Sequence, residues 1–189
     1  EGLKADGHEL KAWWYRELLT TQYPLLERLS LFWHNHFTSS LQKVKWPPFL
    51  YQQNVLLRLY ALGSFRALLT AIAKNPAMLL YLDTQTNHKE HPNENFSREL
   101  FELFTLGVDN GYSQADILQA ARAFTGYRTR FNVGGWQEIA FDPARHDATA
   151  KTLFGVTIPG QNVTDDYAAV ARATVDQRPV AEFICKKLF

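Results

Sequence analysis

NENFSRELFELFTLG, residues 93–107, predicts an amphipathic helix that begins near an asparagine able to cap its first turn and ends at Gly107. At 100° per residue, the polar side chains fall within one arc of about 140°. These are Glu94, Asn95, Arg98, Glu99 and Glu102. The opposite arc carries Phe96, Leu100, Leu103 and Phe104. Such a helix either turns its acidic face to water or sets that face against other polar groups.

PLLERLSLFWHNHF, residues 24–37, predicts a second amphipathic helix, because Pro24 suits a first turn and apolar residues recur at three and four positions up to Phe37. His34 and His36 are two residues apart, so on an ideal helix their side chains point some 200° away from each other. Both rings can therefore face one ion only where the helix has ended. The following Thr-Ser-Ser, residues 38–40, is compatible with such an ending.

The rest of the chain predicts more helices and one hairpin. Helical spacing or capping signals occur in residues 8–21, 49–63, 64–74, 76–82 and 113–126, and again from residue 164. From Tyr127 to Phe141, alternation of apolar and polar residues around Gly134-Gly135 is typical of a β-hairpin. We expect polar loops at residues 83–92 and 142–160, and we expect Trp46-Pro47-Pro48 to stop regular structure.

These patterns predict a mainly α fold, a multi-helix globular domain with one small β-hairpin near residues 127–141. No linker divides the chain, so we expect residues 1–189 to form a single helical domain. The sequence has no initial Met and stops at Phe189 within a periodic run, so we interpret it as an internal fragment of a longer protein. We expect it to pack against the missing parts of its own chain.

Composition narrows the classes of function. The net charge is +1, with 20 basic and 19 acidic residues, which gives no field to gather nucleic acid. No run of about 18 apolar residues predicts a membrane span in this segment. Cys185 is the single cysteine, which excludes an internal disulfide and a cysteine-based metal site but leaves histidine and carboxylate ligands open.

Polar residues embedded in aromatic sequence form the candidate site. Its members are His34, His36, Glu94, Arg98, Glu99, Glu102 and His146. Imidazole and carboxylate groups suit a divalent metal ion, with His34, His36, Glu99 and Glu102 as the candidate ligands. The alternatives are a solvated acidic helix face, one buried and one exposed histidine, and an ordinary polar turn at FDPARHD, residues 141–147.

The chain resembles the bacterial family catalogued as domain of unknown function 1800. The strings that carry the resemblance are LFWHNHF (31–37), PAMLLYLD (76–83), PNENFSRELFELFTLG (92–107), ARAFTGY (121–127), FDPARHDATAKTLFG (141–155) and AEFICKKLF (181–189). Ser97 departs from the family, which more often has alanine there. The resemblance implies a bacterial source, a longer full-length protein and frequent export, but it implies no reaction.

Three functional hypotheses follow from the residues. The first is a metal-binding domain that supports hydrolysis through a metal-activated water. The second is a structural or partner-binding scaffold in which Arg98 pairs with Glu94 or Glu102 and the network fixes helix packing. The third is carbohydrate binding by aromatic rings near loops, although such rings are more often part of a core. The rings concerned are Trp46, Tyr112, Tyr127 and Trp136.

Overall fold

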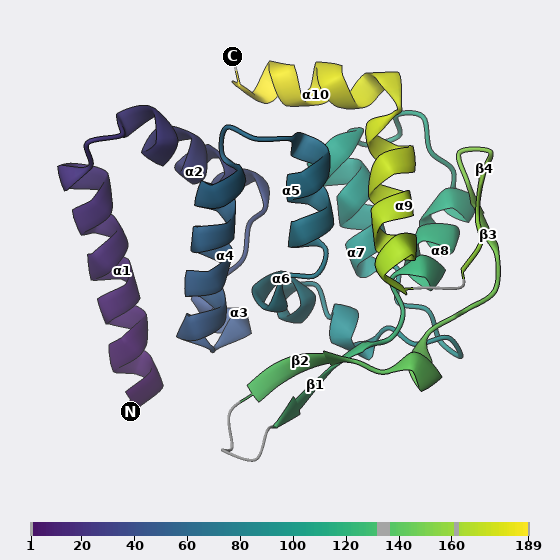
Figure 1. Cartoon of the computed structure of the whole chain (residues 1–189), viewed down its shortest axis with the longest axis horizontal. Coiled ribbons are helices and arrows are strands. Elements are labelled where there is room, and N and C mark those ends of the chain that lie inside the picture. The colour runs from purple at the N-terminus through teal and green to yellow at the C-terminus, as the bar shows by residue number, and fades with distance from the viewer. Residues whose placement is uncertain (1, 132–136, 161–162, 189) are drawn as a thin grey trace. The chain divides into compact units, whose positions relative to one another are not determined.

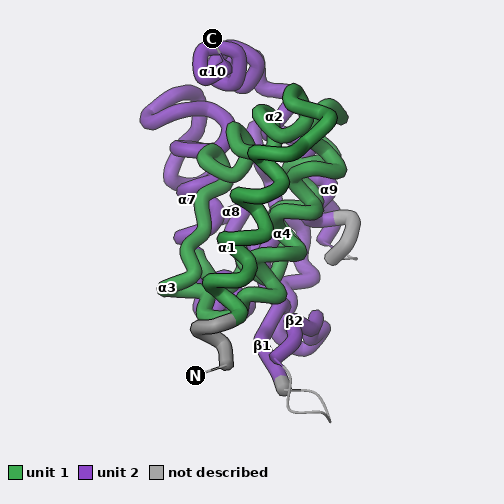
Figure 2. The backbone as a smooth tube through the Cα atoms, turned by 90° about the vertical axis from the view of Figure 1, so that its left-hand side faces the viewer, with its two compact units in different colours: residues 1–81 green, residues 82–189 purple. Residues whose placement is uncertain are grey.

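The computed structural model describes the backbone of residues 2–131, 137–160 and 163–188, and the side chains of residues 6–130, 137–160 and 166–188 (Figure 1). By its contacts the chain divides into two compact units, Glu1–Tyr81 (unit 1) and Leu82–Phe189 (unit 2), which are coloured separately in Figure 2. Within the described residues the fold is mainly helical, with ten α-helices and two small antiparallel sheets, which confirms the predicted class. That residues 1–189 form a single domain stays a prediction.

Unit 1 consists of helices packed around α4. They are α1 (Gly2–Thr20), α2 (Pro24–His36), α3 (Leu41–Val44), α4 (Pro47–Tyr60), α5 (Phe65–Ile72) and α6 (Pro76–Tyr81). Helix α4 contacts each of the other five. Leu57 on α4 is fully buried, and the Trp33 indole donates a hydrogen bond of 3.1 Å to the Ala61 carbonyl at the end of α4. Burial of these apolar side chains stabilises the packing of α2 on α4.

Local sequence signals explain most of the helix ends in unit 1. Pro24 begins α2, and the Ser64 hydroxyl accepts from the Ala67 N–H at the start of α5. We expected Trp46-Pro47-Pro48 to stop regular structure. Helix α3 does end before this run, at Val44, but the expectation is wrong for the residues that follow, because α4 begins at Pro47. Proline is tolerated in a first helical turn, where its missing N–H would have no partner in any case.

Unit 2 packs its helices around a row of aromatic rings. Its helical elements are η1 (Thr84–Thr86), α7 (Asn95–Glu99), η2 (Leu100–Thr105), α8 (Gln114–Ala123), η3 (Pro143–Arg145), α9 (Val163–Val175) and α10 (Arg178–Leu188). The Phe96 ring on α7 lies 5.0 Å from that of Phe124, and the Phe124 ring lies 4.7 Å from that of Tyr167 on α9. Edge-to-face pairs of this kind add stabilisation beyond the area they bury.

The predicted hairpin is present. Strands β1 (Tyr127–Phe131) and β2 (Gln137–Phe141) pair antiparallel, with Tyr127 opposite Phe141. Its predicted turn, including Gly134-Gly135 and Trp136, lies outside the described residues. A second antiparallel pair, β3 (Lys151–Leu153) and β4 (Val156–Ile158), lies within residues 142–160, which we expected to be rich in loops and for which we predicted no strands. Three-residue strands are too short to show an alternating pattern, which is why the sequence did not predict them.

The helix predicted for residues 93–107 changes type along its length. It begins as α7 and continues from Leu100 as a π-helix, in which the Thr105 hydroxyl donates to the Leu100 carbonyl at 2.5 Å. Gly107 follows at φ +94°, in the left-handed region that glycine adopts without a steric penalty. The predicted end of the helix is therefore correct.

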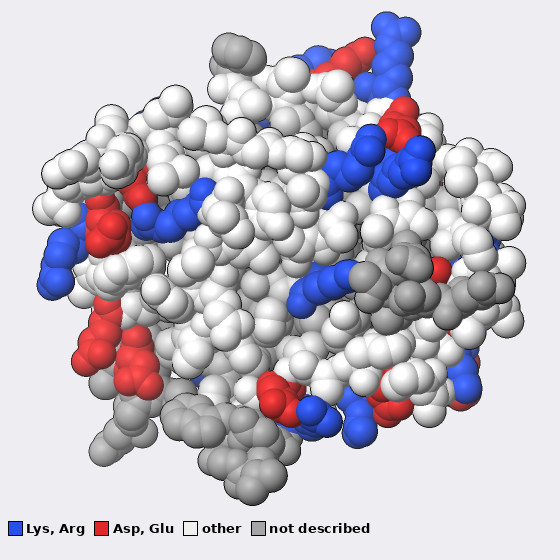
Figure 3. Space-filling model, in the orientation of Figure 1, with Lys and Arg blue, Asp and Glu red and all other residues white. Residues whose placement is uncertain are grey.

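None of the helices in the described part of the chain is both long enough and apolar enough to span a membrane. On the face shown in Figure 3, basic and acidic side chains are interspersed. This distribution agrees with the near-neutral net charge of +1.

Candidate functional site

The two histidines of FWHNHF lie in different surroundings. Helix α2 ends at His36, so both residues are still helical. The His34 ring meets the Trp14 ring of α1 edge to face, with centroids 4.6 Å apart. The buried His36 ring contacts Trp33 and Phe37, at centroid distances of 5.6 and 4.6 Å. The opposite directions expected from their spacing are thus reflected in their separate aromatic contacts.

Arg98 is the centre of the acidic helix face. Its Nη2 lies 3.0 Å from Glu94 Oε2, and its Nη1 lies 3.4 Å from Glu102 Oε1. Nη2 also donates to Gln114 Oε1 at 3.1 Å, while Gln114 Nε2 donates to Glu94 at 2.8 Å. Because Gln114 is the first residue of α8, this network joins α7 to α8.

Glu99 lies beside this network and is not paired in the same way. Burial raises the pKa of Glu99, the charge of Glu102 raises it further, and Arg98 acts in the opposite direction. The proton is therefore held more tightly by Glu99 than by an isolated glutamate. A group with this tendency is a weaker ligand for a cation at moderately acidic pH.

His146 belongs to a second buried cluster in unit 2. Its Nδ1 lies 3.0 Å from the Thr125 carbonyl oxygen, and its Nε2 lies 3.4 Å from Asp166 Oδ2. The same carboxylate oxygen lies 2.7 Å from Nζ of the buried Lys151. Burial acts to raise the pKa of Asp166, but pairing with His146 and Lys151 outweighs it, so the pKa is lowered.

The structure thus brings together part of the predicted set. Arg98, Glu94 and Glu102 form one network with Glu99 beside it, whereas the contacts of His146 are with the Asp166 cluster. Because the positions of the two units relative to one another are not determined, a meeting of His34 or His36 with the acidic helix stays a prediction. In residues 2–131, 137–160 and 163–188, no three His, Cys, Asp or Glu side chains are grouped so that they could hold a metal ion.

The rings proposed for sugar stacking pack on neighbouring rings. Trp46 lies 6.4 Å from Phe49, Tyr112 lies 5.5 Å from Phe101, and Tyr127 lies 5.5 Å from Phe141, all between ring centroids. Trp136 lies outside the described residues. These contacts support the interpretation of the three described rings as part of the cores.

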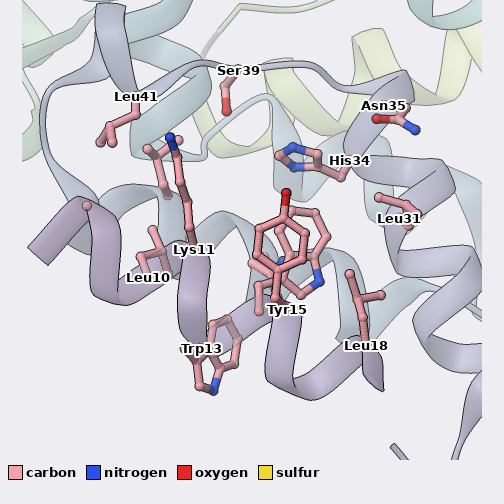
Figure 4. Close-up of a pocket in the computed structure, with 14 residues that line it drawn as sticks. Leu10, Lys11, Trp13, Tyr15, Leu18, Leu31, His34, Asn35, Ser39 and Leu41 are labelled. Carbon is pink, nitrogen blue, oxygen red and sulfur yellow. The ribbon is translucent and has the colours of Figure 1, made fainter. Parts of the chain in front are cut away.

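Unit 1 contains a pocket that the sequence did not predict (Figure 4). It has a volume of about 450 Å³, is open to solvent on one side, and is lined by residues of α1, α2 and α4 together with Ser39 and Leu41. Its walls are largely apolar and include Leu10, Trp13, Trp14, Leu18, Leu31 and Leu50. Lys11, Tyr15, His34 and Ser39 direct their polar ends toward a common space, whereas Asn35 points away from it.

Asn54 also lines this pocket and is held by a buried charge pair. Asn54 is 5% exposed, and its Oδ1 accepts a hydrogen bond of 2.7 Å from Arg58 Nε. Arg58 in turn pairs with Glu27 of α2, which is 4% exposed. The amide oxygen of Asn54 is therefore occupied by Arg58, and its Nδ2 has no hydrogen-bond partner within the described residues.

One sequence signal could have indicated the pocket. The run Trp13-Trp14-Tyr15 places rings around half a helix, more than one packing face requires. Lys11 and Asn54 gave no such signal, because their role depends on contacts between helices far apart in the sequence.

Within the described residues the fold is mainly helical with two small two-stranded sheets, and unit 1 contains a largely apolar pocket. The chain belongs to the family described as protein of unknown function (DUF1800), whose model matches residues 3–189. This match confirms the family resemblance found in the sequence. Neither a curated protein nor a solved structure matches the chain.

Proposed function

We propose that this chain is a helical binding scaffold and that the charged residues of its acidic helix hold its elements together. The observation that carries the proposal is the position of Arg98, which donates to Glu94, Glu102 and Gln114 and so joins α7 to α8. Several charged groups that share one network contribute more than isolated surface pairs do. From the family resemblance, we further propose that this scaffold is part of a bacterial protein that is exported.

A metal-dependent hydrolase, with His34, His36, Glu99 and Glu102 as ligands, has less support. A divalent ion at Glu102 would lie next to the guanidinium of Arg98, and the two positive charges would repel each other. The raised pKa of Glu99 adds competition from a proton. The carboxylates of the acidic helix are thus better placed to neutralise Arg98 than to bind a metal ion.

Replacing Arg98 tests the scaffold. We expect Arg98→Met to lower the free energy of unfolding by about 1 kcal/mol, because it removes two ion pairs and leaves Glu94 and Glu102 without their shared partner. Arg178→Met is the matched control, since Arg178 makes a pair of the same i,i+4 spacing with Glu182 on α10 but is 92% exposed. Urea unfolding monitored by far-UV circular dichroism measures both variants. Equal effects of the two substitutions would contradict a structural role for Arg98.

Metal titration tests the alternative separately. Purified protein is titrated with Zn²⁺, Mn²⁺ and Ca²⁺ while heat release and melting temperature are recorded. The scaffold proposal expects no saturable binding to the acidic helix. Stoichiometric binding that is lost in both His34→Ala and Glu99→Ala would favour the hydrolase and overturn the scaffold.

A further inference from the structure

We propose that the pocket of unit 1 binds a small organic carboxylate with an apolar body, its carboxylate group directed at Lys11 and Asn54. This inference goes beyond the scaffold proposed above and does not depend on it, because the pocket and the Arg98 network lie in different units. It rests on the charge of the pocket, on the hydrogen-bonding groups that are left open and on the walls.

The charge of the pocket favours an anion. Lys11 is the one Lys or Arg among the described lining residues, and none of those residues is Asp or Glu. Within the described residues Lys11 has no ion-pair partner. Lys11 is exposed, so its charge is partly screened by water, but the largely apolar walls on its pocket side strengthen its attraction for an anion that binds there.

Asn54 supplies a fixed donor. Its side chain is buried, and Arg58 occupies its Oδ1, so the amide can direct only its Nδ2 hydrogens to a ligand. Because Asn54 lines the pocket, its Nδ2 can donate to a ligand that enters. The charge pair between Arg58 and Glu27 keeps the amide in this orientation, which makes Arg58 a positioning residue.

The remaining polar groups add donors without adding charge. Burial lowers the pKa of His34, so the imidazole is neutral at pH 7 and offers one N–H and one acceptor nitrogen. The Tyr15 hydroxyl can donate or accept, and the Ser39 hydroxyl donates to Gln53 and keeps its lone pairs. Because Lys11 is the one cation among the described lining residues, a ligand with a single carboxylate group matches the charge of the pocket.

The walls select the apolar part of the ligand. Leu10, Leu18 and Leu31 provide aliphatic surface, and the Trp13 ring is held in place by the Arg58 guanidinium, 5.2 Å from its centre. A volume of about 450 Å³ lies in the ordinary range of small-molecule sites. A neutral sugar fits less well, because its many hydroxyl protons need acceptors and no carboxylate is found among the lining residues that the structure describes.

The test compares two probes that differ only in their polar head. Octanoate and octanol are each titrated into the full chain, and binding is measured by calorimetry and by tryptophan fluorescence. We expect saturable binding of octanoate, at least about tenfold tighter than that of octanol, because the carboxylate gains a charge-assisted hydrogen bond from Lys11. Absence of saturable octanoate binding, or equal affinity for the two probes, would overturn the proposal.

Two substitutions locate the carboxylate. We expect Lys11→Met, which keeps an unbranched apolar stem, to weaken octanoate about tenfold and to leave octanol within about twofold. Arg16→Met removes a cation from the same helix outside the pocket, and it should change neither affinity. Asn54→Asp keeps the shape and can still pair with Arg58, but it puts a negative charge beside the ligand, so octanoate binding should be lost at unchanged melting temperature.

Other outcomes would overturn the inference. Equal weakening by Lys11→Met and Arg16→Met would mean that only the overall charge matters. Chitotriose, titrated in parallel as a neutral sugar, should show no binding, and binding of the sugar without binding of octanoate would assign the pocket to carbohydrates.

Discussion

His34 shows how burial can set the protonation state of a residue. Its ring packs against Trp14, and burial lowers its pKa below the ordinary value of 6.5. In the unfolded chain the ring binds a proton near pH 6.5, whereas in the folded chain it does so only at lower pH. The stability that the chain gains by burying the neutral His34 ring is therefore fully present above pH 6.5. It is lost as the pH falls toward the lower pKa of the folded chain.

The corresponding prediction is a change in pH dependence. We expect His34→Gln to reduce the loss of unfolding free energy between pH 6.5 and pH 5, because glutamine does not titrate. Urea unfolding at several pH values, followed by tryptophan fluorescence, measures this, since Trp13, Trp14, Trp33 and Trp46 all lie in unit 1. His8→Gln, an exposed position on α1, is the control. An unchanged slope in His34→Gln would show that the burial of this ring has no thermodynamic effect.

At this scale the sequence predicts contacts within one helix better than contacts between elements. The pairing of Arg98 with Glu94 and Glu102 follows from i,i+4 spacing and was predicted. The pairing of His146 with Asp166 spans 20 positions, and no local pattern indicates it. Asn54 contacts Arg58 at i,i+4 spacing, but Arg58 is in turn oriented by Glu27 of α2, 31 positions away, and no local pattern indicates that pair.

At the scale of elements, Gly126 forms the joint between α8 and β1. Its φ of +109° is one that L side chains rarely adopt, and a Cβ placed there would lie 2.4 Å from Phe141 Cε2 and 3.1 Å from His146 Cβ. The chain can turn from helix to strand at this point only because no side chain occupies the space.

We expect Gly126→Ala to lower the free energy of unfolding by about 3 kcal/mol, as the sum of backbone strain and of displaced ring and histidine atoms. Gly155→Ala separates the two causes, because Gly155 has φ +76° with nothing within 4 Å of a built Cβ. Only the strain of about 1 kcal/mol should remain in that variant. Equal losses in urea unfolding of the two variants would show that Phe141 moves aside without cost.

Gly155 also shows why the second hairpin was not predicted. Phe154 and Gly155 form its two-residue turn with φ values of +50° and +76°. Asn-Gly or Asp-Gly would have indicated such a turn, but phenylalanine is uncommon at positive φ and gives no signal. Helices α2 and α8, in contrast, were predictable because each carries a repeating apolar pattern and a start signal, Pro24 for α2 and the capping residue Ser113 for α8.

At the scale of the whole molecule, a short connection joins the two compact units, Glu1–Tyr81 and Leu82–Phe189. The boundary between them falls in a short connection, since α6 ends at Tyr81 and η1 begins at Thr84. Independent domains are usually joined by longer, exposed segments rich in proline, glycine or polar residues. That residues 1–189 form a single domain stays a prediction, and cooperative unfolding is the property that tests it.

A single domain unfolds in one cooperative step, so a substitution in unit 2 should weaken unit 1 equally. We expect Gly126→Ala to shift the urea midpoint of tryptophan fluorescence, which reports mainly on unit 1, as far as that of far-UV circular dichroism. Octanoate, if it binds the pocket of unit 1, should raise both midpoints together, because a ligand stabilises the whole cooperative unit that contains its site. A fluorescence midpoint that stays at its wild-type value while the dichroism becomes biphasic would mean that residues 1–81 and 82–189 are separate folding units.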